Sequence, residues 1–161
     1  MIIAGIDNGV TGSIGVLGGH FREFWRTPKF KHQKYTKKKA FVNRINGDML
    51  SVIMLDPGVT LAIIERPMVN PQRFQASTSA LRALEATLIV LERLEIEYEF
   101  CDSKEWQHAL LPGIKGSEFL KKASMELGIK LYPEHEELIR KQKDADGLLI
   151  AHWYKEYKLK E

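Results

Sequence analysis

Three apolar segments of this sequence have a carboxylate at one end, and this pattern limits how the chain can fold. Asp7 and Glu65 each end an apolar run, whereas Asp146 precedes one. Carboxylates avoid buried surroundings unless they are paired or bind a cation. Three of them at the rims of core elements therefore predict a site where negative charges converge on a metal ion.

The N-terminal part of the sequence predicts an antiparallel meander. We expect its strands at residues 1–6, 13–17 and 21–26, separated by turns that contain glycine. The first strand alternates between its two faces, so Ile3, Gly5 and Asp7 share one of them.

The rest of the chain predicts two more strands among helices. The strands are expected at residues 59–65 and 96–101, and the helices at residues 47–55, 74–94, 103–111, 118–127 and 146–157. Asn46 is the expected cap of the first helix, and Ser117 and Gly128 are expected to begin and end the fourth. This order fits the α/β class, a mixed sheet covered by helices, within one domain over residues 1–161.

Basic residues gather between Arg26 and Arg44, where the sequence has no acidic residue. The lysines of this block are Lys29, Lys31, Lys34, Lys37, Lys38 and Lys39. A net charge of +3 alone does not indicate a polyanionic partner, but a local basic block attracts phosphate. The block is equally compatible with a solvated loop. Its Phe30 and Tyr35 could stack on bases or anchor that loop to the core.

Several classes of protein lack support in the sequence. It has no Cys/His cluster with zinc spacing, no Gly-x-Ser-x-Gly motif and no Walker-type motif. No apolar run approaches the ~18–20 residues that cross a bilayer, and the N-terminus lacks the pattern of a secretion signal, so no membrane partner is expected. The single Cys101 fits core packing in a reducing compartment, which indicates the cytoplasm.

The acidic residues indicate a particular metal chemistry. Carboxylate ligands without Cys or His pairs suit Mg²⁺ or Mn²⁺, and paired hard cations suit phosphodiester hydrolysis. Asp146 lies on the apolar face of its helix, whereas Asp144 can face the same ion only from the preceding loop. Each residue also has a structural alternative: Asp7 in a turn, Glu65 in an ion pair with Arg66 or a lysine, and Asp146 as a helix cap.

At these residues the sequence resembles the RuvC-type Holliday junction resolvases, a branch of the RNase H-like superfamily. The matching segments are residues 5–12, 63–67 and 144–151, whose order and spacing fit across nearly the whole chain. The small size and the basic segment are most similar to bacteriophage members, which would place the protein in the host cytoplasm.

The resemblance implies an RNase H-like fold with a five-stranded mixed sheet flanked by α-helices. It implies a homodimer that cuts a four-way DNA junction as a crossover junction endodeoxyribonuclease, with two Mg²⁺ or Mn²⁺ ions per site. Asp7, Glu65 and Asp146 would hold these ions, with Asp144 as the candidate fourth ligand. The sequence departs from the family at Lys143, where an acidic residue or histidine is common, and at Asn8, where proline is common.

The resemblance also implies residues that contact DNA. A lysine near the scissile phosphate is expected, with Lys121 and Lys115 ranked ahead of Lys104 and Lys122. The expected DNA-binding residues are the six lysines of the basic block together with Arg73, Lys115 and Lys122. Met68 and Phe74 match a segment that wedges into the junction, although both side chains could simply pack.

Three other functions are compatible with the sequence. Another RNase H-like nuclease, acting on flaps, branched DNA or RNA–DNA hybrids, would use the same carboxylates. Sugar kinases and actin-like ATPases have a similar opening motif but need two such domains and a longer chain, and a non-catalytic nucleic-acid-binding module would use the carboxylates only structurally. For a homodimer, the long helix offers an apolar surface formed by Leu81, Leu84, Leu88 and Leu91.

Overall fold

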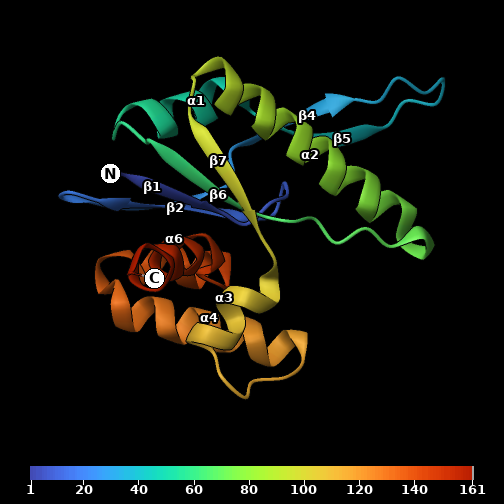
Figure 1. The fold of residues 1–161 in the computed structure, drawn as a ribbon. Coiled ribbons are helices and arrows are strands. Elements are labelled where there is room, and N and C mark those ends of the chain that lie inside the picture. Colours follow the sequence, from blue (N-terminus) through green and yellow to red (C-terminus); the bar gives the residue numbers. More distant parts are fainter. Residues whose placement is uncertain (161) are drawn as a thin grey trace.

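The computed structural model describes residues 1–160 as a five-stranded mixed sheet with helices on both faces, the α/β class expected (Figure 1). The strands are β1 (Ile3–Ile6), β2 (Ser13–Gly18), β3 (Phe21–Arg26), β6 (Leu61–Glu65) and β7 (Glu97–Cys101). Their order across the sheet is β3-β2-β1-β6-β7. The first three strands form the predicted antiparallel meander, whereas β6 runs parallel to both β1 and β7.

Helices cover the two faces of this sheet unequally (Figure 1). One face carries α1 (Gly47–Leu55) and α2 (Phe74–Arg93), and the other carries α3 (Ser103–Leu110), α4 (Ser117–Leu131), α5 (Glu136–Gln142) and α6 (Asp146–Glu156). Short 3-10 turns lie at Pro71–Arg73, Pro133–His135 and Lys158–Lys160. No helix within residues 1–160 is long and apolar enough to cross a membrane.

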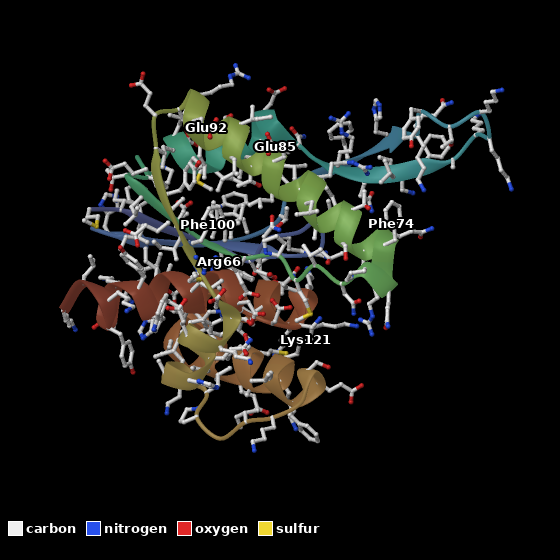
Figure 2. The ribbon with its side chains drawn as sticks, turned by 45° about the vertical axis from the view of Figure 1, so that its right-hand side comes forward. Arg66, Phe74, Glu85, Glu92, Phe100 and Lys121 are labelled. Carbon is white, nitrogen blue, oxygen red and sulfur yellow. The ribbon has the colours of Figure 1, made fainter. Side chains whose placement is uncertain are left out.

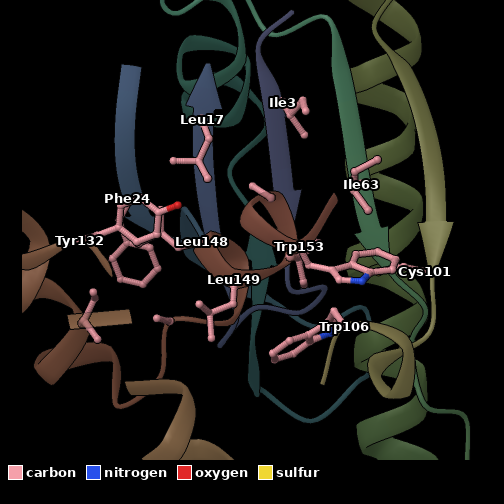
Figure 3. Close-up of a cluster of buried hydrophobic side chains, with 14 of the residues drawn as sticks. Ile3, Leu17, Phe24, Ile63, Cys101, Trp106, Tyr132, Leu148, Leu149 and Trp153 are labelled. Carbon is pink, nitrogen blue, oxygen red and sulfur yellow. The ribbon is translucent and has the colours of Figure 1, made fainter. Parts of the chain in front are cut away.

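The predicted alternation of β1 divides the core into two clusters. Ile3 packs on the side of α6, whereas Ala4 and Ile6 pack on the side of α1 and α2. Figure 3 shows the cluster on the α6 side, where strand residues meet Trp106 and Trp153. Cys101 is buried in this cluster and burial raises its pKa to about 12, which confirms its packing role.

The helix boundaries confirm some sequence predictions and contradict others. Asn46 caps α1 as expected, because its side-chain oxygen accepts a hydrogen bond from the Met49 amide at 3.1 Å. However, Ser117 is the first residue of α4 rather than its cap, and α4 continues through Gly128 to Leu131. Gly128 serves packing instead of termination, since a Cβ there would lie 2.2 Å from the Cβ of Ala145. Helix α5 was not predicted.

The basic block forms a β-hairpin, not the loop that its composition allows. Strands β4 (Lys29–Gln33) and β5 (Phe41–Ile45) pair antiparallel as a separate two-stranded sheet. A bond from the Asn46 amide to the Pro28 carbonyl (2.9 Å) closes its base. The hairpin extends beyond the main sheet beside α2 (Figure 1). Because β3 runs parallel to β1, the hairpin starts from the edge where β1 and β6 end.

Candidate active site

The parallel pairing of β1 and β6 places two carboxylates next to each other at one edge of the sheet. Ile6 is opposite Ile64 in the register, so Asp7 and Glu65 follow at equivalent positions. The Asp7 amide donates a hydrogen bond to the Ser13 carbonyl at 3.0 Å, which fixes the backbone just past β1. By the alternation of the strands, both carboxylates belong to the face covered by α6.

Three glycines bring the start of α6 into direct contact with this part of the sheet. A Cβ on Gly5 would lie 2.3 Å from the Gly147 carbonyl oxygen, and one on Gly15 would lie 2.4 Å from the Leu148 Cα. A Cβ on Gly147 would in turn meet the Ser13 carbonyl oxygen at 2.6 Å. The backbones therefore approach more closely than any side chain permits, and the first turn of α6 comes close to Asp7.

The loop before α6 supplies a third carboxylate. Asp144 is buried and lies in the loop before α6, outside the helix. This is the position from which it can share an ion with Asp146. One carboxylate oxygen each from Asp7, Asp144 and Asp146 lies within 4.8 Å of the other two. Lys143 is exposed and ends α5 in the left-handed region (φ 75°), so it stands outside this cluster.

Neighbouring side chains hold this loop in place. The Ser124 hydroxyl on α4 donates to Asp146 and accepts a hydrogen bond from the Ala145 amide at 3.0 Å. The Gln142 amide nitrogen donates to the Thr11 carbonyl at 2.8 Å, which joins the end of α5 to the turn after Asp7. The alternative in which Asp146 is a conventional helix cap is wrong, because Asp146 is the first helical residue and its side chain faces the cluster.

The clustered carboxylates have raised pKa values. For Asp7 the pKa lies well above its ordinary value, first because of burial and then because of the charges of Asp146, Glu65 and Asp144. Burial and the Asp144 charge raise the pKa of Asp146 from 3.8 to about 7. Such a group is unfavourable as an anion unless a cation offsets its charge. The donor set fits a hard divalent cation, since it consists of carboxylate oxygens at a partly buried position.

Glu65 lies outside the 4.8 Å group but within electrostatic range of it. Its charge raises the pKa of Asp7 and of Asp146. Its Oε2 atom accepts a hydrogen bond from the indole N–H of the fully buried Trp106 at 2.7 Å. The alternative of an ion pair with Arg66 is wrong, because Arg66 instead pairs with Asp102 at 3.0 Å and lies over the Phe100 ring.

Lys121 is the lysine whose charge acts on the clustered carboxylates. Its positive charge lowers the pKa values of Asp7, Asp144 and Asp146, although burial outweighs it. Figure 2 shows Lys121 on the α4 side of the molecule. Lys122 instead pairs with Glu126 along α4 at 3.9 Å, and Lys115 lies exposed in the loop before α4.

The other predicted DNA-binding residues are exposed groups on the hairpin and around the start of α2 and α4. All six lysines of the basic block are exposed on the hairpin. Arg73 ends the turn before α2, and Phe74, labelled in Figure 2, begins that helix. Met68 and Phe74 are 84% and 75% exposed, so the packing alternative is wrong for both.

Two residues that hold the site were missed by sequence reasoning. Trp106 and Ser124 bind Glu65 and Asp146, but they come from α3 and α4, far along the chain from their partners. The sequence contained only a weak signal for the role of Ser124. Ser124 stands four residues before Gly128 on one helix face, and this face packs against the loop before α6.

Comparison with known proteins identifies the fold. No protein-family model matches the sequence, and no curated protein matches it. Among solved structures, Thermus thermophilus RuvC in complex with a Holliday junction substrate is similar, with a TM-score of 0.60 and 15% identity over 99% of this chain and 96% of that one. The fowlpox virus Holliday junction resolvase is also similar, with a TM-score of 0.53 and 11% identity over 99% of both chains. This chain therefore has the RuvC-type version of the RNase H-like fold.

Proposed function

We propose that this chain is a metal-dependent, structure-selective DNA endonuclease that resolves four-way junctions by paired phosphodiester hydrolysis, with residues 1–161 forming one nuclease domain. The observation that carries this proposal is the cluster of Asp7, Asp144 and Asp146 at one edge of the sheet. Glu65, the last residue of β6, lies at the same edge. A solved structure with the same fold is a RuvC bound to a Holliday junction substrate, which supports the choice of DNA.

The carboxylates are suited to hold Mg²⁺ or Mn²⁺. Asp7, Asp144 and Asp146 would bind one ion together, and Glu65 stands where it can contribute to a second. When bound, two such ions stabilise the charge that develops on a phosphodiester during in-line displacement. Asp144 is proposed as the fourth ligand because it is buried and lies in the loop beside Asp146.

The remaining residues of the site position these ligands and the DNA. Trp106 donates a hydrogen bond to one oxygen of Glu65, and Ser124 fixes the orientation of Asp146. Lys121 places a positive charge beside the carboxylates, where it can contact the phosphate to be cut. We therefore propose catalytic roles for Lys121 and for the four carboxylates, which would act by holding the metal ions: Asp7, Glu65, Asp144 and Asp146.

The exposed cations and apolar groups outside the carboxylate cluster would bind the rest of the junction. The proposed phosphate contacts are Lys29, Lys31, Lys34, Lys37, Lys38, Lys39, Arg73, Lys115 and Lys122. Exposed apolar side chains after β6 and at the start of α2, Met68 and Phe74, are proposed as the wedge at the point of strand exchange. The Phe74 ring can stack on a base that is not stacked inside a duplex, and Met68 can insert between base steps as an apolar wedge.

Two coordinated cuts across a four-way junction require two active sites, so we propose a homodimer. Helix α2 is the proposed interface. Leu81 is 46% exposed and Leu84 and Leu88 are half-buried, whereas Leu91 is fully buried in the core of its own protomer and cannot contribute. Sedimentation at micromolar concentration tests this assignment, and a monomer there would contradict the paired-cut mechanism.

A substrate panel tests the proposed function directly. The purified protein is incubated with a four-way junction, a flap, a duplex and an RNA–DNA hybrid, with and without Mg²⁺. We expect Mg²⁺-dependent paired nicks in the junction. A preference for the linear hybrid would instead indicate another RNase H-like nuclease, and absence of cleavage in every substrate would indicate a non-catalytic binding module.

A further inference from the structure

The β4–β5 hairpin lies outside the five-stranded sheet but is joined to the carboxylate edge. It starts just after β3, whose last residue, Arg26, donates from Nε to the Gln142 side-chain oxygen at 3.0 Å. Gln142 in turn holds the turn after Asp7 through the Thr11 carbonyl. The base of the hairpin is therefore fixed relative to the candidate site, and DNA bound at that site would extend beside the hairpin.

The tip of the hairpin carries an aromatic ring that contributes nothing to the fold. Tyr35 is 98% exposed, and within residues 1–160 its side chain has no hydrogen bond and no ring contact. Four exposed lysines flank it in the sequence of the tip: Lys34, Lys37, Lys38 and Lys39. The interpretation that Tyr35 anchors this segment to the core is therefore wrong, and its ring is free to bind a partner.

One face of the hairpin combines aromatic and cationic groups. Phe30 is opposite Arg44 in the register, and the Arg44 guanidinium lies 6.0 Å from the Phe30 ring centre. The His32 ring contacts Phe30 edge-on with centroids 6.0 Å apart. No acidic residue occurs between residues 24 and 47, so the whole arm is positively charged. Such interleaving of rings and cations suits a nucleic-acid strand better than an apolar protein partner.

We infer that the hairpin is an arm that binds unpaired nucleotides of the DNA substrate, with Tyr35 stacking on a base and the lysines contacting the flanking phosphates. A lysine arm without a ring would bind any DNA backbone equally. An exposed ring adds selectivity, because a base offers its flat face only where it is not stacked inside a duplex. This inference deepens the proposed function, since it states which feature of the DNA the protein recognises.

Binding in the presence of EDTA tests the arm without cleavage. Anisotropy is measured with a labelled duplex that contains a short single-stranded gap and with a fully paired duplex of equal length. Tyr35→Ala should weaken binding to the gapped DNA by about tenfold, the loss expected for one base–aromatic stack, and leave binding to the paired duplex unchanged. Tyr35→Phe retains the ring and should bind the gapped DNA like the unaltered protein.

Two control variants separate stacking from charge and from general damage. Tyr157→Ala removes a tyrosine that is 45% exposed after α6, on the other face of the sheet, and should change neither affinity. The double change Lys37→Ala and Lys38→Ala should weaken both DNAs and reduce the slope of log affinity against log salt by about one to two.

The inference is overturned if Tyr35→Ala weakens both DNAs equally or weakens neither. Because Tyr35 is almost fully exposed, this variant should retain the thermal stability of the unaltered protein. The readout needs no metal and no hydrolysis, so a failure of the proposed nuclease activity would not alter it. Conversely, the unaltered protein could cleave the junction while Tyr35→Ala has no effect on binding to gapped DNA. That result would refute the proposed role of the hairpin and would leave the proposed nuclease function unaffected.

Discussion

Replacing Asp146 by asparagine should stabilise the protein in the absence of divalent cations while removing a proposed metal ligand. The carboxylate is half-buried and close to Asp7 and Asp144. Burial, followed by the Asp144 charge, raises its pKa from 3.8 to about 7. An asparagine side chain has nearly the same shape and no charge, and its oxygen can still accept the hydrogen bond from Ser124.

The size of the effect follows from the raised pKa of Asp146. At 1.36 kcal/mol per pH unit, the interval between 3.8 and about 7 corresponds to at most about 4 kcal/mol of destabilisation when the group is ionised. Local relaxation and water entry reduce this value, so we expect a gain of ~1–2 kcal/mol for the variant at alkaline pH. For a protein of this size, that raises Tm by roughly 3–8 °C.

The effect should depend on pH in one direction. Because the folded-state pKa lies above the unfolded-state value, the native protein binds more protons between these two values and loses stability as the pH rises through them. The advantage of the asparagine variant should therefore be absent near pH 4, grow as the pH rises and be complete above about pH 7.

Thermal unfolding in EDTA across this pH range measures the difference. Mg²⁺ should then raise the Tm of the unaltered protein more than that of the variant, because the variant lacks one ligand charge. Asp56→Asn is a matched control, since Asp56 is exposed at the end of α1 and away from the carboxylates. The reasoning is refuted if Asp146→Asn lowers Tm at alkaline pH in EDTA, or if its effect is the same near pH 4.

Three further substitutions probe the site and its scaffold. Asp7→Asn should abolish Mg²⁺-dependent junction cleavage in a gel assay while leaving junction affinity equal or tighter by anisotropy, because a charge that repels phosphate is lost. Trp106→Phe removes the N–H donor to Glu65 and leaves a void, so urea unfolding should show a loss of about 2 kcal/mol and cleavage should need more Mg²⁺. Gly5→Ala places a Cβ 2.3 Å from a backbone oxygen of α6 and should cost ~3 kcal/mol or more, whereas Gly47→Ala, with 3.4 Å of clearance, should be nearly neutral.

Each of these outcomes has a clear opposite. Normal cleavage by Asp7→Asn would remove the catalytic assignment of the cluster. An unchanged Mg²⁺ requirement for Trp106→Phe would mean that the indole only fills space. Equal stability of the two alanine variants would contradict the close packing of α6 on the sheet.

Local signals were sufficient to predict most of the regular structure. The cap at Asn46 and the alternation of β1 are encoded within a few residues, so their positions could be inferred without tertiary information. The hairpin lacked such a signal because β4 is exposed along its whole length and has no apolar face to pattern. The prediction that Gly128 ends a helix was wrong for a related reason. The role of Gly128 depends on its contact with Ala145, which comes from another part of the chain.

The same division applies to the candidate site. Asp7, Glu65 and Asp146 could be selected because each interrupts or borders an apolar run, which is unfavourable unless the residue has a function. Their companions Trp106 and Ser124 are ordinary residues of amphipathic helices, and their importance comes only from what they touch after folding. A sequence can therefore indicate the charged groups of such a site more readily than the neutral groups that orient them.

The closure of the hairpin base between Pro28 and Asn46 makes this element a self-contained module. The chain leaves the main body and returns to it at two neighbouring points, joined by one backbone hydrogen bond of 2.9 Å. Such an insertion can be shortened, lengthened or exchanged at a surface turn without altering the register of the five central strands. Under the proposed function, the DNA preference of this architecture could thus diverge, or be engineered, independently of the carboxylates proposed to hold the metal ions.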